Sequence, residues 1–313
     1  MGRLFSDAKE HVASLWNLGG LSAGEFLRSV WGGIVQNDLI DRAYELAFNF
    51  LLAVFPLLLL IVASLNIFAS EGTAMRRALY YYIAVALPPD ASALIVGTLH
   101  EVTRNPHNSD AGKLAFGVVL WLFAGSSGMT QLISTLNAAY EVREERSWIL
   151  VHLISMALTL AMSVLIVLAL VLILFGGDLI TRISFLLGLP AMASAAIKVV
   201  EWMVALAFVI FAFANVYYFA PDVKQHPWYW ITPGSCVGVI LWVLASVGLR
   251  VYLHYFNTYS TMYGSLGAVI VLMLWFYVAG LAMLIGGQIN ATIEHAAAEH
   301  GNPEAKLPEE KAT

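Results

Sequence analysis

The sequence predicts an all-α, polytopic membrane protein with six transmembrane helices, an N-terminal amphipathic helix and short helices in the first outer loop. Hydrophobic residues make up 60% of the 313 residues and charged residues only 12%, and the charges are concentrated between six long apolar runs and at the two ends. A spanning helix needs about 20 mainly apolar residues, which every run supplies. A soluble protein with six buried helices would instead need a polar outer layer. The runs are Leu46–Ala69, Leu114–Leu136, Ile149–Phe175, Ile197–Phe219, Ser235–Phe256 and Ser265–Ile289.

The segment before the first run predicts the amphipathic helix. Within Leu21–Ile40, apolar residues recur at helical spacing and polar residues occupy the other positions. This pattern is typical of a helix in the lipid headgroup region, and equally of a short helix packed on the bundle. The apolar residues are Leu27, Val30, Trp31, Ile34 and Val35.

The first outer loop contains two amphipathic stretches, Met75–Leu87 and Asp90–Thr103, separated by Pro88 and Pro89. Because consecutive prolines break a helix, we expect two short surface helices that either cap the bundle as a lid or only cover it. Farther along, we expect the third span to end at Gly176-Gly177-Asp178 and the fourth at Ala220-Pro221-Asp222.

Three regions follow from these patterns. Residues 1–45 form an N-terminal segment, residues 46–295 the six-helix domain, and residues 296–313 a polar tail predicted to be disordered. Nine of the 16 Lys and Arg residues fall in the segments on the N-terminal side of the membrane and six in the opposite segments. Positive charge favours the cytoplasmic side, so we expect both termini in the cytoplasm.

Polar residues inside the runs are the candidates for a substrate path, because polar groups are costly in a bilayer. In the predicted orientation they all lie in the cytoplasmic half. They could line a polar cavity open to the cytoplasm, or they could only join helices through hydrogen bonds. The candidates are Glu45, Asn49, Gln131, Asn137, Asn215, Gln288 and Asn290.

Other positions suggest lipid contacts and hinges. Arg250 lies toward the outer leaflet, where it could bind lipid phosphate or simply reach the interface. Pro56 frees a helical carbonyl, and Gly125 and Gly128 bracket a polar stripe, so these residues, with Gly264, are candidate hinges. Gly234 and Gly238 form a GxxxG pair that permits close helix approach.

Several function classes find no support in the sequence. His100 and Glu101 lack the second histidine of a zinc-binding HExxH helix, and no phosphate-binding P-loop is present. We therefore expect no catalytic residues, no metal and no cofactor. The net charge of −5 and the lack of a basic, aromatic-rich face argue against nucleic acid. Membrane lipids are the expected partners, and the sequence leaves a homo-oligomer open.

Several motifs resemble the YihY/BrkB family of bacterial inner-membrane proteins, once labelled ribonuclease BN. The similarity spans roughly residues 25–295, although Gln288 stands where family members usually carry Glu. The motifs are Tyr259-Ser260-Thr261-Met262-Tyr263-Gly264-Ser265-Leu266-Gly267, Gly286-Gly287-Gln288-Ile289-Asn290, Leu136-Asn137-Ala138-Ala139-Tyr140 followed by Arg146, and Tyr217 to Pro221 leading to Pro233-Gly234.

The resemblance implies six transmembrane helices, an inner-membrane location and a role in the cell envelope. From it and the polar residues we expect a transporter or flippase of an amphiphilic, anionic envelope lipid. The alternatives are a non-catalytic scaffold for envelope assembly and, with no candidate residues in this chain, a membrane ribonuclease or other hydrolase.

Overall fold

The computed structural model describes residues 16–68, 77, 80–81, 84, 89, 92–97, 110–187, 191–223, 231–255 and 265–300. The elements in this part are all helices. They are η1 (Leu18–Gly20), α2 (Ala23–Gln36), α3 (Leu39–Phe68), α6 (Asp110–Ala139), α7 (Trp148–Leu187), α8 (Ala191–Phe219), α9 (Pro233–Tyr255) and α11 (Ser265–Glu299).

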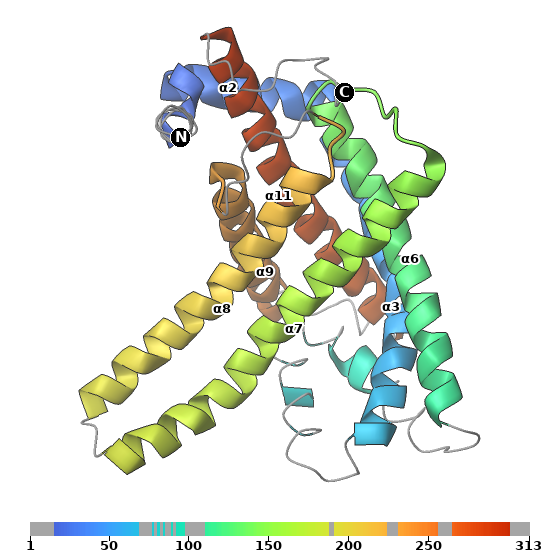
Figure 1. The fold of residues 1–313 in the computed structure, drawn as a ribbon, viewed down its shortest axis with the longest axis vertical. Helices are drawn as coiled ribbons and strands as arrows, with labels where there is room; N and C mark the ends of the chain where they lie inside the picture. The colour runs from blue at the N-terminus through green and yellow to red at the C-terminus, as the bar shows by residue number, and fades with distance from the viewer. Residues whose placement is uncertain are drawn as a thin grey trace, which may run out of the picture.

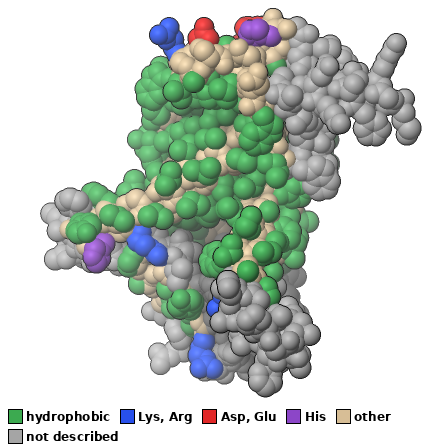
Figure 2. All heavy atoms as spheres, turned by 90° about the vertical axis from the view of Figure 1, so that its left-hand side faces the viewer, with side chains coloured by type: hydrophobic (Ala, Val, Ile, Leu, Met, Phe, Trp, Pro, Cys, Tyr) green, Lys and Arg blue, Asp and Glu red, His purple; other side chains and the backbone are tan. Residues whose placement is uncertain are grey.

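Among the described residues, five helices are long and apolar enough to cross a membrane: α6, α7, α8, α9 and α11. Helix α3 has a comparable length of 30 residues, but the side chains of its second half lie outside the described residues. Figure 2 shows a broad band of hydrophobic side chains below a cap of charged ones. This distribution agrees with the predicted membrane-embedded class of protein.

Helix α2 lies across one end of the bundle, where the last turns of α11 also lie (Figure 1). We call this end the α2 end. A capping box fixes the start of α2: the Ser22 hydroxyl accepts from the Glu25 backbone N–H, and the Glu25 carboxylate accepts from Ser22 in return. Two turns of the chain, with positive φ at Gly19 and Asp38, flank the helix.

Two adjacent faces of α2 are apolar. Val30 and Ile34 are buried against the bundle, which confirms contact with the other helices. Leu27, Trp31 and Val35 are exposed on the neighbouring face. The helix therefore packs on the bundle, as the second interpretation of the sequence expected, and presents another apolar stripe outward.

The core is not the same at the two ends of the bundle. At the α2 end one continuous apolar cluster includes side chains from α2 and from all six long helices, among them Leu39, Leu132, Leu158, Val216 and Ile289. At the opposite end, a second cluster joins only α3, α9 and α11 among the described side chains. Figure 1 shows α7 and α8 running side by side away from the other helices toward this end.

Some boundaries differ from the prediction. The expected helix end at Gly176-Gly177-Asp178 is wrong, because α7 continues through these residues to Leu187. Glycine costs only about 1 kcal/mol in a helix, and an apolar environment makes broken backbone hydrogen bonds more costly than that. The expected end of the fourth span after Phe219 is confirmed, and α9 begins at Pro233, two residues before the fifth predicted run.

The first and last long helices extend beyond their predicted limits. Helix α3 begins at Leu39 instead of Leu46, and α11 ends at Glu299, four residues into the segment predicted as a disordered tail. Ala296 and Ala297 are buried because η1 packs on them: a Cβ added to Gly19 would lie 3.0 Å from Ala296 Cβ. Residues 301–313 lie outside the described residues, as does most of each predicted outer-loop helix.

Candidate functional site

The hydrogen bonds of the seven candidate path residues fall into separate groups. Asn215 donates to the Phe211 carbonyl of its own helix at 2.7 Å. Gln288 accepts from Asn37 at 3.1 Å, which connects α11 to the turn between α2 and α3. Asn290 accepts from the Gly234 backbone N–H at 2.8 Å and so holds the start of α9 on α11. Gln288 and Asn290 therefore connect different segments, whereas Asn215 bonds within its own helix.

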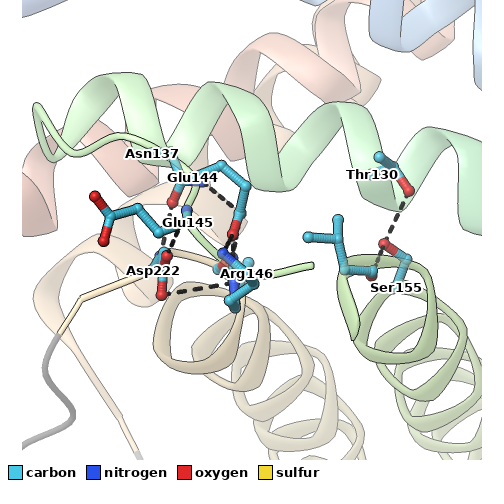
Figure 3. Close-up of polar contacts among 9 residues, drawn as sticks. Thr130, Asn137, Glu144, Glu145, Arg146, Ser155 and Asp222 are labelled. Atoms are coloured by element: carbon cyan, nitrogen blue, oxygen red, sulfur yellow. Dashed lines mark hydrogen bonds and ion pairs between the residues drawn. The ribbon is translucent and has the colours of Figure 1, made fainter. Parts of the chain in front are cut away.

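Asn137 belongs to a network of charged groups at the turn between α6 and α7 (Figure 3). Its side-chain oxygen accepts from the Asp222 backbone N–H at 2.7 Å, and its amide donates to Glu144 at 2.8 Å. Arg146 lies between the two acids, with Nη2 2.6 Å from Glu144 Oε2 and Nε 3.6 Å from Asp222 Oδ1. We call Asn137, Glu144, Arg146 and Asp222 the turn network.

The turn network holds the end of α8 against the α6–α7 turn. Arg146 Nη2 also donates to the Ala220 carbonyl at 2.8 Å, and the Glu145 backbone N–H donates to Asp222 at 3.0 Å. Glu144 and Asp222 were not predicted as site residues. Asp222 follows Pro221, and Glu144 follows a turn. Acids at such positions are usually solvated, so the sequence did not indicate that these two have partners. Only the packing of the turn against the end of α8 shows them.

The turn network predicts a pH dependence of stability. Burial raises the pKa of Glu144, but hydrogen bonds from Arg146 and Asn137 outweigh it and hold the pKa below its usual value of 4.5. A carboxyl with a lowered folded-state pKa stabilises the fold above its unfolded pKa, and this contribution disappears as the pH falls through the folded value. We therefore expect the Tm difference between the wild type and Glu144→Gln to be constant from pH 7 to about pH 5. It should shrink below pH 4.5; a difference that stays constant down to pH 3 would contradict the assignment.

The remaining three candidates lie together on the outer side of α3 and α6. Gln131 Nε2 donates to the Glu45 carboxylate, and Asn49 Nδ2 donates to the Glu45 backbone carbonyl at 2.9 Å. Glu45 is exposed, as are Ser127 and Ser134 on the adjacent face of α6. We call Glu45, Asn49, Ser127, Gln131 and Ser134 the lateral patch. Its three exposed members, Glu45, Ser127 and Ser134, face outward from the bundle.

Close helix approach at a glycine joint explains the GxxxG pair. A Cβ added to Gly234 would overlap the Gly286 carbonyl, and one added to Gly286 would lie 2.6 Å from the Gly234 carbonyl. A Cβ on Gly238 would lie 2.9 Å from the hydroxyl of Tyr217, which is buried and donates to the Met283 carbonyl at 2.7 Å. The joint therefore fixes α8, α9 and α11 to one another.

The other candidates have ordinary surroundings in the described structure. Gly125 and Gly128 lie in the uninterrupted helix α6, where Thr159 and Phe50 pack over them at 3.1 and 3.2 Å from an added Cβ. Helix α3 continues through Pro56, and Gly264 lies outside the described residues. Arg250 is exposed, with Nη2 3.4 Å from the Ala84 carbonyl. The described residues contain no group of three or more side chains suited to a metal ion.

Helices α7 and α8 separate from their neighbours toward the end opposite α2. Ser126, Thr159 and Phe213 are buried on α6, α7 and α8. Seven residues away on the same helix faces, Val119, Ile166 and Leu206 are 67%, 39% and 44% exposed. The contact between Thr130 and Ser155, whose hydroxyl oxygens are 2.9 Å apart, belongs to the packed half (Figure 3). The helix pair is thus attached at the α2 end and separated at the other.

A family profile described as virulence factor BrkB matches residues 30–310. The chain belongs to the BrkB family. The ribonuclease-like protein YfkH of Bacillus subtilis is 30% identical over 285 residues, which cover 91% of this chain and 98% of the relative. A UPF0761 membrane protein of Vibrio atlanticus is 27% identical, over 86% of this chain and 82% of its own.

These comparisons and the apolar helices make this BrkB-family chain a multi-pass membrane protein. No solved structure matches it. Three of the four stretches that carried the family resemblance lie toward the α2 end of the bundle, whereas most of Tyr259–Gly267 lies outside the described residues. Asn137 and Arg146 lie in the turn network, while Tyr217 and Gly286 lie in the glycine joint.

Proposed function

We propose that this BrkB-family protein is a transporter or flippase of an amphiphilic envelope lipid in the bacterial inner membrane. The observation that carries the proposal is the separation of α7 and α8 from α6 and α9 in one half of the bundle only. A transporter needs two arrangements of its helices around a path, and rocking of one helix pair against the rest is a common way to provide them.

The proposed membrane placement uses six spans, namely α3 and the five helices that are long and apolar enough to cross a membrane. Both ends of the chain then lie on one side, which we place in the cytoplasm. The exposed stripe Leu27, Trp31 and Val35 of α2 would lie in the cytoplasmic headgroup region, together with the exposed Trp16 and Trp148. The separated half of α7 and α8 would then face the outer leaflet. Arg250, exposed on α9, would lie among the outer headgroups, where an anionic lipid would meet it.

The α2 end supplies a fixed attachment for such a motion. The turn network ties the ends of α6 and α8 together, and the contact between α6 and α7 uses small polar side chains. Ser155 and Thr159 donate to carbonyls of their own helix at 2.8 and 2.7 Å. Since these hydroxyls are satisfied within α7, sliding against α6 would leave no buried donor unpaired.

A cross-linking test with a reductant-cleavable reagent addresses the motion directly. In a chain whose single cysteine, Cys236, is replaced by alanine, we introduce Val119→Cys and Ile166→Cys on the facing sides of α6 and α7. A short bifunctional thiol reagent should hold the two helices together and stop the transfer of labelled lipid across proteoliposomes, and cleavage of the cross-link should restore it. Each single-cysteine variant, treated in the same way, provides the control. If the cross-linked protein moves lipid at the rate of the controls, or if no labelled lipid moves under any ion gradient, the proposal fails.

A non-catalytic scaffold for envelope assembly is the second candidate function. The engagement of Asn137, Gln288 and Asn290 in hydrogen bonds between segments favours it. A scaffold would keep its partners when α6 and α7 are cross-linked, and would lose them when surface loops are changed. Our proposal assigns no catalytic residue, although one relative is named as ribonuclease-like. Metal-dependent hydrolysis by pure protein, lost with one named side chain, would contradict that choice.

A further inference from the structure

The lateral patch places polar side chains on an outer surface of the bundle. In a membrane protein with apolar helices, such a surface faces lipid. On α6, Phe116 and Phe123 are 65% and 63% exposed, and the same outward face continues toward the α2 end as Ser127 and Ser134. The exposed face of α3 beside it is apolar at Phe48 and Leu52. The patch therefore interrupts an otherwise apolar belt.

The depth of the patch follows from a contact between helices. Thr130, next to Gln131, touches Ser155 on α7, and Ser155 lies seven residues after the exposed Trp148 that begins this helix. Two helical turns correspond to about 10 Å. Tryptophan marks the headgroup level, so Gln131 and its partner Glu45 lie up to about 10 Å closer to the bilayer centre. An exposed carboxylate at such a depth is costly unless a polar group covers it.

The chemistry of the patch selects the covering group. Among the described residues, one oxygen of the Glu45 carboxylate accepts from Gln131, and the other accepts no hydrogen bond. Asp41, one turn closer to the α2 end on α3, is also exposed. A second copy of the chain with twofold symmetry would bring Glu45 toward its own equivalent, which repulsion between like charges disfavours. An ammonium group supplies both the donors and the charge that the acids lack.

We propose that the lateral patch binds the headgroup of an amino-phospholipid from the cytoplasmic leaflet. The ammonium lies on Glu45, and the Ser127 hydroxyl and the Gln131 amide face the phosphate, while the acyl chains lie along Phe48 and Phe123. This inference rests on the proposed function for the side of the membrane on which the patch lies and for treating the bound lipid as a substrate. It also refines the expectation of an anionic lipid, because a phosphate headgroup without an ammonium would be repelled by Glu45.

Native mass spectrometry of the full chain tests the site. The protein is extracted from vesicles that contain equal amounts of phosphatidylethanolamine and phosphatidylglycerol, and the lipid retained on it is counted. We expect the wild type to retain phosphatidylethanolamine about tenfold over phosphatidylglycerol. Glu45→Gln, which keeps the shape of the side chain, should abolish the preference. Gln131→Met, which leaves Glu45 in place, should weaken retention of both lipids. Glu299→Gln, the same change at an exposed position of α11, should leave the preference unchanged.

Two results would overturn the proposal. One is equal retention of the two lipids by the wild type, or a ratio of phosphatidylethanolamine to phosphatidylglycerol that is the same for the wild type and Glu45→Gln. The other is a dimer that disappears with Glu45→Gln, which would assign the patch to a second copy. The outcome is independent of transport: lipid preference without lipid movement would leave the site standing and remove the transporter.

Discussion

Replacing Gly286 with leucine is expected to destabilise the protein by about 3 kcal/mol or more, enough to prevent recovery of a monodisperse bundle. A single added carbon at Gly286 already overlaps the Tyr217 hydroxyl and lies 2.6 Å from the Gly234 carbonyl. Helix α11 cannot move away from α9 and α8 to make room without losing the hydrogen bonds from Gly234 to Asn290 and from Tyr217 to Met283. Thermal unfolding in detergent, followed by size-exclusion chromatography with fluorescence detection, measures the effect.

Gly248→Leu is the matched control, because Gly248 lies in α9 and a Cβ added there would meet no atom within 4 Å. Its Tm should stay within about 2 °C of the wild type. Gly286→Ala should fall between the two. Equal Tm values for Gly286→Leu and Gly248→Leu would show that α9 and α11 do not approach each other as closely as the structure has them.

Arg146→Ala is expected to produce the second-largest loss, roughly 3 kcal/mol, because it leaves two acids of the turn network without their cation. The Arg146 side chain is 13% exposed and that of Asp222 is 9% exposed, so water replaces little of the lost interaction. Glu144, at 29%, is more accessible, and its share of the loss is correspondingly smaller. The substitution also removes the donor to the Ala220 carbonyl at the end of α8. Thermal unfolding in detergent measures the loss.

Two further variants separate charge from geometry. Arg146→Lys keeps the charge but not the forked donors that reach Glu144 and Ala220 together, so it should recover less than half of the loss. The double variant Arg146→Ala with Glu144→Gln should be more stable than Arg146→Ala alone, because it removes one unpaired acid. Arg143→Ala, at an exposed position of the same turn, provides the control and should be close to neutral. If Arg143→Ala and Arg146→Ala lose the same stability, the turn network contributes little.

The contacts of the lateral patch and the turn network could not be predicted from the sequence. Residue type alone marked Glu45, Asn49 and Gln131 as polar candidates within or beside apolar runs. It did not indicate whether these side chains face an internal cavity or the lipid, because that depends on the rotation of each helix against its neighbours. The structure turns Glu45 and Ser127 outward, and it uses Asn137, Gln288 and Asn290 as joints.

The difference in helix packing between the two ends of the bundle could not be predicted from the sequence either. The apolar runs of α7 and α8 are hydrophobic on all sides, so nothing in their pattern distinguishes a face packed on protein from one packed on lipid. Burial separates the two: Thr159 is covered and Ile166, on the same face, is 39% exposed. For the same reason the pattern could not show that α7 continues past Gly177.

The sequence by itself determined the class of the protein, its apolar helices and the end of the bundle at which its polar groups gather. These properties depend on the composition and length of runs of neighbouring residues, which can be compared directly with the thickness of a bilayer. Tertiary structure alone decided what each polar group contacts. Asn137 meets Asp222 across 85 residues and Asn290 meets Gly234 across 56, and such pairs are set by how the helices pack, a property that no local pattern records.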